Sequence, residues 1–514
     1  MKSQKLLLLS LLPLSLGSTA FGQLTDKTWT GASNGGWGGG LNWSDGNATI
    51  TGGNNLIFNS GANLADNWTG NFRTMGALTY GGSTDITTRL TTTDGTVGRG
   101  ITFSSTAGDA EINISGSTNV LLTNNDVATN SDITLADNLV MNHTGTGTLT
   151  LDSKIVGTGD ITINGTSLAN TVIFDNAGTA NTYTGDLLID GGNLQVLNAG
   201  KLGNANNSIT IRDGGQLHFT GASTVASTRS TTLANGDAYL RTDDGVSTTW
   251  NADIDGSGKF IKVGEGDINL LGANTFSGGL EVRDGRIFVN NSTGSGPASL
   301  GSGDITLNSD VETDTAAGAT IFFQNPVGDS TLTNDIILTG NGGTLLVGGN
   351  TTTLSGVVSG TGDLRKNGGG TLSLTGAYAL AGNLIIDASG AVNLGDAGTF
   401  TFDIGAAGVN NAIFQDTSAI SAFTIDGDFI FDLADAGTGE SDTWSIIGST
   451  VLASTTFGTN FSVSGFTESS GVWSNGSYEF SELTGVLTVV PEPSTFALLG
   501  GLLALSWVMV RRSR

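Results

Sequence analysis

Two stretches of the chain carry the same pattern of residues. GSGKFIKVGEGDINLLGA at residues 256–273 returns as GTGDLRKNGGGTLSLTGA at residues 360–377, at a constant offset. Chance does not produce a run of matches this long. The pairs that match in type are Gly256/Gly360, Gly258/Gly362, Phe260/Leu364, Lys262/Lys366, Gly264/Gly368, Gly266/Gly370, Ile268/Leu372, Leu270/Leu374 and Gly272/Gly376. Such a repeat predicts a protein assembled from stacked copies of one structural unit.

A second element follows the first. NTYTGDLLIDGGNLQV at residues 181–196 aligns without gaps on NTFSGGLEVRDGRIFV at residues 274–289. YALAGNLIIDASGAVNL at residues 378–394 is a weaker third copy that needs one inserted residue, and shorter echoes of the form GxGDIT begin at Gly157 and Gly301. The repeats therefore occupy the middle of the chain.

Apolar and polar residues alternate within each copy, as in Ile268 with Leu270 and Ile287 with Val289. A period of two is the signature of a β-strand with one buried face. Gly, Asn and Asp separate these short runs, where turns need positive φ angles. The body shows no apolar stripe with helical spacing, so we predict an all-β fold.

Short, evenly spaced strands suit either a parallel β-helix or a series of β-sandwiches. Asp190-Gly191 and Asp284-Gly285 are typical of hairpin turns, which keeps the sandwich alternative open. Each repeat, however, has little apolar surface of its own, and stacking similar rungs lets such units share a core. We therefore expect a parallel β-helix.

The repeats resemble a known family. GGTLSLTGAY at 369–378 and GANTFSGGLEVRDGRIFV at 272–289 are similar to autotransporter-associated β-strand repeats. The resemblance implies a right-handed parallel β-helix, a solenoid of the kind displayed on bacterial surfaces. We assign it to residues 140–395.

The segments on either side of the repeats are expected to cover the two ends of the coil. Residues 23–139 are expected to form an N-terminal β-rich cap and the first rungs, and Trp29, Trp37 and Trp43 within them either cover the end of the coil or offer an aromatic platform to carbohydrate. Residues 396–490 are expected to form a C-terminal β-rich domain. Its apolar residues are Phe423, Ile425, Phe429, Phe431, Leu433, Trp444, Phe461, Trp473 and Tyr478.

Residues 1–22 have the layout of a secretory signal peptide: two lysines, an apolar stretch and small residues at Ala20 and Gly22. We expect signal peptidase to cleave before Gln23. The apolar run is too short to span a hydrocarbon core of about 30 Å, which disfavours a membrane anchor.

The end of the chain, VPEPSTFALLGGLLALSWVMVRRSR at residues 490–514, differs from the body. It resembles the PEP-CTERM sorting signal: the motif Pro491, Glu492 and Pro493, an apolar segment from Phe496 to Val510, and a basic end. The basic residues are Arg511, Arg512 and Arg514. The resemblance implies cleavage by an envelope protease of the exosortase type, a Gram-negative host and association with exopolysaccharide.

The apolar segment at residues 496–510 fits a short transmembrane helix that resides in the inner membrane only until sorting. At 1.5 Å per residue it reaches about 22 Å, less than the core of a bilayer. The arginines would stay in the cytoplasm by the positive-inside rule and leave residues 23–490 outside. A permanent short anchor without processing is the alternative.

Composition excludes several kinds of chemistry. The 514 residues include no cysteine, so thiol catalysis, Cys-zinc sites and iron–sulfur clusters are impossible. The net charge is −26, from 20 Lys+Arg and 46 Asp+Glu. Removing the two terminal segments takes away five basic residues and one acidic residue, which leaves about −30. So acidic a body repels phosphate backbones, and we expect no nucleic-acid partner.

Candidates for catalysis or metal binding are few. His143 and His218 are expected on the surface, and the pairs Asp243/Asp244 and Asp426/Asp428 do not stand out from the other Asp-containing turns. GTGDIT and GSGDIT lack the spacing of the calcium-binding nonapeptide. We therefore expect no catalytic residue, cofactor or metal.

The function expected from the sequence is that of an exported, non-catalytic structural or adhesion protein of the cell surface or extracellular matrix. The alternative is a β-helix carbohydrate-active enzyme, either a polysaccharide lyase or a hydrolase, with carboxylates as acid and base.

Overall fold

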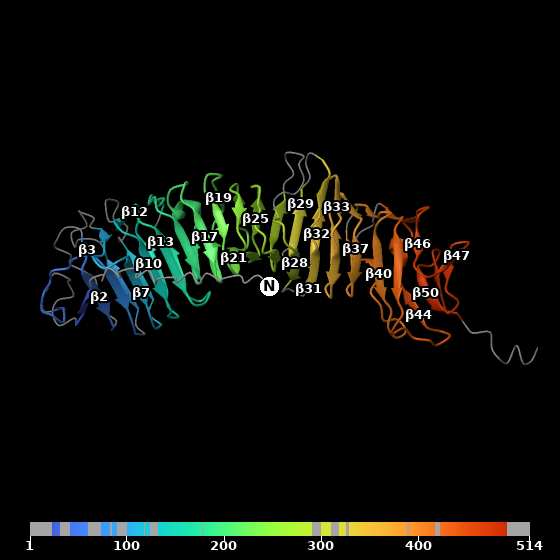
Figure 1. Ribbon diagram of the computed structural model, residues 1–514, viewed down its shortest axis with the longest axis horizontal. Helices are drawn as coiled ribbons and strands as arrows, with labels where there is room; N and C mark the ends of the chain where they lie inside the picture. Colours follow the sequence, from blue (N-terminus) through green and yellow to red (C-terminus); the bar gives the residue numbers. More distant parts are fainter. Residues whose placement is uncertain are drawn as a thin grey trace, which may run out of the picture.

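The structure is a computed structural model. It describes residues 23–30, 42–59, 73–82, 85–89, 100–117, 119–123, 132–176, 178–289, 300–309, 318–324, 328–387, 390–416 and 422–490. These ranges consist mainly of short β-strands, with the short helices η2 (Ala199–Leu202) and α1 (Ser449–Leu452). Figure 1 shows an elongated coil that begins near β2 and β3 and ends near β44, β47 and β50. The predicted all-β class is confirmed.

The largest sheet in these ranges has 16 strands, all paired in parallel, and runs along most of the coil. Its strands are β5 (Ile86–Arg89), β8 (Val120–Thr123), β11 (Thr148–Asp152), β14 (Thr171–Phe174), β16 (Asn193–Val196), β18 (Gly215–Phe219), β21 (Asp237–Thr242), β24 (Lys259–Val263), β26 (Leu280–Val282), β28 (Ile305–Ser309), β31 (Ile336–Gly340), β34 (Val358–Gly360), β37 (Ala377–Leu380), β40 (Thr399–Asp403), β43 (Asp428–Asp432) and β46 (Ser462–Val463).

Two parallel sheets accompany it in the first half of the chain. The ten-stranded sheet contains β1 (Thr25–Thr28), β2 (Asn54–Phe58), β4 (Ala77–Tyr80), β7 (Ala110–Ile114), β10 (Leu139–His143), β13 (Ile161–Gly165), β15 (Leu187–Asp190), β17 (Ile209–Arg212), β20 (Thr231–Leu233) and β23 (Ile254–Asp255). The four-stranded sheet contains β3 (Arg73–Met75), β6 (Ile101–Phe103), β9 (Ile133–Leu135) and β12 (Ile155–Gly157).

Two other parallel sheets take their places further along. The nine-stranded sheet contains β19 (Ser223–Val225), β22 (Ser247–Trp250), β25 (Asp267–Leu270), β27 (Arg286–Val289), β29 (Thr320–Phe323), β32 (Gly343–Val347), β35 (Leu364–Asn367), β38 (Leu384–Ile386) and β41 (Ile413–Gln415). The six-stranded sheet contains β30 (Ser330–Leu332), β33 (Thr351–Leu354), β36 (Thr371–Leu374), β39 (Val392–Leu394), β42 (Phe423–Ile425) and β45 (Thr455–Phe457).

From β2 to β46, successive strands lie in different sheets, and this makes the chain coil. After β24 the chain enters the nine-stranded sheet as β25, and Thr275 N then donates to Ile254 O over 2.8 Å beside β23. The next strand, β26, stacks on β24, where Leu280 pairs with Phe260. One turn of the coil therefore visits three sheets and returns to the first, as a β-helix requires.

This pairing removes the sandwich alternative for the body. Asp190-Gly191 connects β15 to β16, and Asp284-Gly285 connects β26 to β27; in each case the two strands lie in different sheets. The residues that suggest a hairpin instead make a corner between faces. Gly191 and Gly285 have φ angles of 69° and 66°, which explains why glycine is used there.

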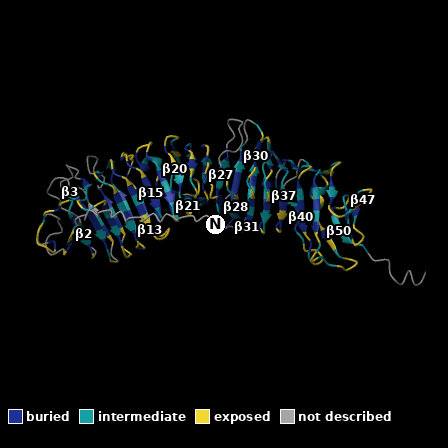
Figure 2. Cartoon of the chain, in the orientation of Figure 1, coloured by how far each residue is buried: buried dark blue, intermediate teal, exposed yellow. Residues whose placement is uncertain are grey.

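The core lies inside the coil. Alternate residues of each strand point inward and stack on their equivalents one rung away, so that Val282, for example, is 0% exposed. Figure 2 shows this buried interior continuing along the coil. Because each rung shares its apolar surface with two neighbours, the coil is stabilised as a stack rather than turn by turn.

Equivalent glycines of the two repeat copies have similar backbone conformations and surroundings. Gly256 and Gly360 have φ angles of 104° and 118°. A Cβ on Gly256 would overlap the carbonyl oxygen of Leu233, and one on Gly360 would overlap that of Leu338. These glycines are therefore retained both for their φ angle and for the closeness of the adjacent rung.

The repeat copies do not lie on the same sheet. Leu187–Asp190, Leu280–Val282 and Leu384–Ile386 are equivalent in the aligned copies, yet they belong to the ten-stranded, the 16-stranded and the nine-stranded sheet. Each copy is thus moved by one face relative to the copy before it. The repeat specifies a strand–corner–strand unit and not a face of the coil.

Aromatic residues cover the N-terminal end. Trp29 and Trp43 are 5% and 2% exposed, and their rings meet edge to face with centroids 5.2 Å apart. They pack on Phe58, which stacks on Tyr80. Because these two tryptophans are buried, the end-cap interpretation holds for them and the carbohydrate-platform interpretation is wrong; Trp37 lies outside the described residues.

An antiparallel sheet covers the other end. It has five strands within the described ranges: β44 (Thr443–Ser445), β47 (Thr467–Ser469), β48 (Val472–Ser474), β49 (Tyr478–Ser481) and β50 (Val486–Val489). The parallel 16-stranded ladder also continues past residue 396, as far as β46, which lies between β44 and β47 in the chain. The coil thus extends into the segment expected to be a separate C-terminal domain.

Candidate functional site

The outer face of the 16-stranded sheet carries a row of polar side chains on β18, β21 and β26. His218 pairs in register with Arg241, and Arg241 with Val263. Lys262 pairs with Val282, so Arg283 lies on the rung after Val263. Parallel strands are about 4.8 Å apart, which puts the backbones of Arg241 and Arg283 roughly 10 Å apart. Both point outward, because the side chains of each strand alternate between its two faces.

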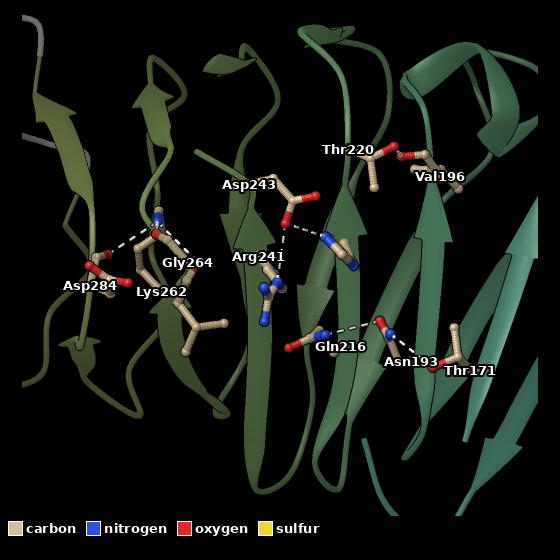
Figure 3. A network of polar contacts seen from close by, with 12 residues as sticks. Thr171, Asn193, Val196, Gln216, Thr220, Arg241, Asp243, Lys262, Gly264 and Asp284 are labelled. Atoms are coloured by element: carbon tan, nitrogen blue, oxygen red, sulfur yellow. Dashed lines mark hydrogen bonds and ion pairs between the residues drawn. The ribbon is translucent and has the colours of Figure 1, made fainter. Parts of the chain in front are cut away.

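His218 and Asp243 form the first part of this surface. His218 Nε2 and Asp243 Oδ1 are 2.8 Å apart. Arg241 Nε donates to the same oxygen of Asp243 over 3.3 Å, and Figure 3 shows Arg241 beside Asp243. Burial lowers the pKa of His218 and outweighs the opposing effect of the Asp243 carboxylate. Burial alone would raise the pKa of Asp243, but the hydrogen bonds from His218 and Arg241 lower it. Asp243 therefore stays ionised and fixes both neighbours.

The sequence-based expectation for the two histidines is wrong. The His218 side chain is only 11% exposed, and its ring nitrogen is within hydrogen-bond distance of Asp243. His143 is 0% exposed at the end of β10, in the inward-pointing phase of that strand. Burial lowers the pKa of His143, so this histidine is a neutral core residue. The turn-like sequence after His143 suggested a surface loop, although His143 is the last residue of a strand.

Lys262 supports the surface from within the coil. It is 0% exposed, and its Nζ donates to the main-chain oxygens of Val263 at 3.0 Å, of Asp284 at 3.1 Å and of Gly264 (Figure 3). Burial lowers its pKa to about 7, although Asp284 and Asp267 oppose that change. The ammonium group thus joins the corner after β24 to the corner after β26.

A second charged cluster lies beside the first. Glu281 is 5% exposed and accepts hydrogen bonds from Lys259, from Arg283 Nε at 2.6 Å and from Asn308 Nδ2 at 3.2 Å. Burial would raise the pKa of Glu281, but these donors lower it to about 2. The Arg283 guanidinium also lies 5.7 Å from the centroid of the Tyr239 ring. Arg283 is therefore held in one orientation from two sides.

These side chains surround a surface pocket of about 450 Å³. It is lined by Arg241, Asp243, Asp244, Val263, Gly264, Glu265, Arg283 and Asp284. The predicted pair Asp243/Asp244 therefore lies at a structured site, together with residues from two later rungs. Sequence reasoning missed the two arginines; their only signal was a local gathering of basic residues between 241 and 286 in an acidic chain.

The other predicted carboxylates have structural roles. Asp426 accepts from the backbone N of Asn460 at 2.9 Å, and Asp428 accepts from Ser462 Oγ at 2.6 Å. Both therefore link successive rungs near the C-terminal end. Among the described residues, no cluster of three or more His, Asp or Glu side chains is arranged to hold a metal ion.

The predicted processing sites fall mainly beyond the described ranges. Ala20 and Gly22, the motif Pro491–Pro493, the apolar segment 496–510 and the terminal arginines are all outside them. Gln23 is described and exposed, two residues before β1. At the other end Val490 N donates to Ser477 O over 2.8 Å, which fixes the chain just before the motif. In the ranges described, no helix has the length and hydropathy to cross a membrane.

Comparison with known proteins bears on both parts of the chain. Residues 489–512 match the family described as the PEP-CTERM protein-sorting motif. The adhesin BmaC autotransporter of Brucella suis biovar 1 (strain 1330) is 31% identical over 147 residues. This similarity covers 27% of the present chain and 4% of the adhesin.

The fold and these matches define the class of the protein as a β-helical solenoid with a C-terminal sorting signal. In particular, the C-terminal segment matches the PEP-CTERM sorting motif, and the similarity of part of the chain to an autotransporter adhesin supports repeats of the autotransporter-associated kind. Both findings support an exported surface protein.

Proposed function

We propose that this protein is a non-catalytic adhesion or structural component of the surface or matrix of a Gram-negative bacterium, associated with exopolysaccharide and sorted by an exosortase-type protease. One observation carries the proposal: the same chain has a sorting motif at 489–512 and a body that forms a solenoid. The similarity to a protein named as an adhesin supports it.

At Asp243 the chemistry of the pocket favours binding over catalysis. A glycosidase needs one carboxyl group with a raised pKa as its general acid. The pKa of Asp243 is lowered instead, and two donors occupy one of its oxygens. Asp243 thus serves better as a fixed acceptor than as a proton donor.

The proposed route also gives the terminal segments their roles. Signal peptidase releases the chain before Gln23, and the segment 496–510 holds it in the inner membrane until the protease acts near Pro491–Pro493. Because Val490 is tied to Ser477, the motif would follow directly after a folded cap. That arrangement would present it close to the membrane surface.

Processing is tested by replacing Pro491, Glu492 and Pro493 together with alanine. The apolar segment and the arginines remain, so the variant should accumulate as a membrane-bound precursor while the wild type is released. Mass spectrometry of the mature wild type should find its C-terminus near residues 491–494. A mature pool that retains Arg514 would contradict sorting by cleavage.

Matrix association is tested by fractionating cells into inner membrane, outer membrane, extracellular matrix and medium. The mature protein should be found with the matrix or the outer surface, and enzymatic removal of exopolysaccharide should release it. Purified protein incubated with acidic and neutral polysaccharides should leave their chain lengths unchanged. Depolymerisation would replace the proposal with the enzyme alternative.

A further inference from the structure

We propose that the pocket between Arg241 and Arg283 binds a neutral, hydroxyl-rich polysaccharide. This inference rests on the proposed function in one respect: it takes the partner of the coil to be a glycan and names its chemical class. The site itself is defined by the lining residues on β21, on β24 and in the corners that follow β21, β24 and β26.

The pocket combines fixed donors with fixed acceptors. Arg241 and Arg283 supply guanidinium donors, which cannot accept hydrogen bonds. Asp243, Asp284 and the exposed pair Asp244 and Glu265 supply carboxylate acceptors, which cannot donate when they are ionised. A ligand that satisfies both sets needs groups that donate and accept at the same position. Sugar hydroxyls have this property.

The charges select against anionic ligands. A uronic-acid polymer would bring its carboxylates next to Asp244, Glu265 and Asp284, and the protein as a whole carries −26. A cationic polymer would be attracted by the carboxylates, but its charges would also meet the guanidinium groups of Arg241 and Arg283, which offer it no acceptor. Bringing like charges together is costly, whereas a neutral hydroxylated chain meets no such penalty.

The donors are oriented before any ligand arrives. Asp243 holds Arg241, while Glu281 and the Tyr239 ring hold Arg283. Lys262 fixes the corners that bear Gly264 and Asp284. Side chains already held in place lose little conformational entropy on binding, which favours recognition of a flexible polymer.

The direction of the pocket suits a linear chain. It extends from β21 across β24 to the corner after β26, and so crosses rungs that are about 4.8 Å apart. Its volume of about 450 Å³ is within the range of small-ligand sites. A polysaccharide aligned with the long axis of the coil would place successive sugars over successive rungs.

The test is affinity gel electrophoresis of the exported body of the chain, residues 23–490, in gels that contain galactomannan, dextran or alginate. The wild type should be retarded by at least one of the two neutral polymers and less by alginate. In Asp244→Ala with Glu265→Ala the dissociation constant for that neutral polymer should rise roughly tenfold, because two acceptors to hydroxyls are lost. Both residues are exposed, so this variant should fold.

Asp396→Ala with Glu440→Ala is the matched control, since it removes the same charge at exposed positions far from the pocket in sequence and absent from its lining. It should bind like the wild type. Arg241→Met should also weaken binding, with folding checked by circular dichroism. No retardation of the wild type by either neutral polymer, stronger retardation by alginate, or equal binding by wild type and pocket variant would each overturn the proposal.

Cell fractionation separates failure of this inference from failure of the proposed function. If the wild type and the pocket variant are equally retained in the matrix, the matrix role stands and the pocket is not its binding site. If the wild type never reaches the matrix, the proposed function fails, while the gels still decide what the pocket binds.

Discussion

Lys262 and Asp284 lie on successive rungs, and the buried ammonium group of Lys262 donates to the main-chain oxygen of Asp284 over 3.1 Å. A basic side chain thus takes an inward position that the alternation of the strand reserves for apolar residues. Its repeat partner, Lys366, is also 0% exposed and donates to Gly368 O at 2.5 Å. The matched lysines of the repeat are therefore corner supports.

Lys262→Ala should lower the free energy of unfolding by about 2–4 kcal/mol, because it leaves a cavity and three carbonyl groups without their donor. Urea unfolding followed by circular dichroism measures the change. Lys154→Ala, at a half-buried position, should change stability by no more than about 0.5 kcal/mol. Equal effects would mean that the Lys262 contacts do not support the coil.

Stability should increase with pH between about 7 and 10. Burial lowers the pKa of Lys262 to about 7 and that of Lys366 to about 8, whereas both are near 10.5 in the unfolded chain. In that window the unfolded state binds more protons, so the free energy of unfolding rises with pH, by up to about 1.4 kcal/mol per unit for each lysine. Urea midpoints at pH 7 and pH 9 measure this slope, and Lys262→Met should reduce it. An unchanged slope in that variant would contradict the assignment.

Val282→Asp should destabilise the protein by about 4 kcal/mol or more, since Val282 is 0% exposed and the new charge would have no partner in the core. Arg283→Ala, one residue further on the outer face, should cost only about 1–2 kcal/mol, because Glu281 keeps Lys259 and Asn308 as donors. Thermal unfolding of both variants compares the two faces directly. A larger loss for Arg283→Ala would reverse the assignment of inner and outer positions.

Gly360→Ala should destabilise by about 2–4 kcal/mol, because its φ angle is 118° and the new methyl group would meet Leu338 O on the preceding rung. Gly369→Ala makes the same chemical change within the same repeat copy, where a Cβ has nothing within 4 Å. It should be nearly neutral. The difference in urea midpoint between the two variants is the measurement, and similar values would show that the rungs separate more easily than the structure implies.

Much of this architecture follows from local sequence. Alternation at Ile268 and Leu270 gives strands with one inward face, and glycines such as Gly256 and Gly360 mark where rungs approach one another. Asp190-Gly191 shows what local sequence cannot predict, because the same dipeptide occurs both in hairpin turns and at the corners of a coil. Only the pairing of strands distant in the chain separates those two outcomes.

The sequence by itself determined the all-β class, the stacked repeats and the terminal sorting motif, since each depends on spacing between nearby residues. The tertiary structure decided which sheet each repeat copy joins, because successive copies are not a whole number of turns apart and each copy is therefore moved by one face. It also decided that His143 is buried and that Arg241 and Arg283 share a pocket. Residues about one or two turns apart become neighbours only when the rungs stack, and stacking depends on the whole coil.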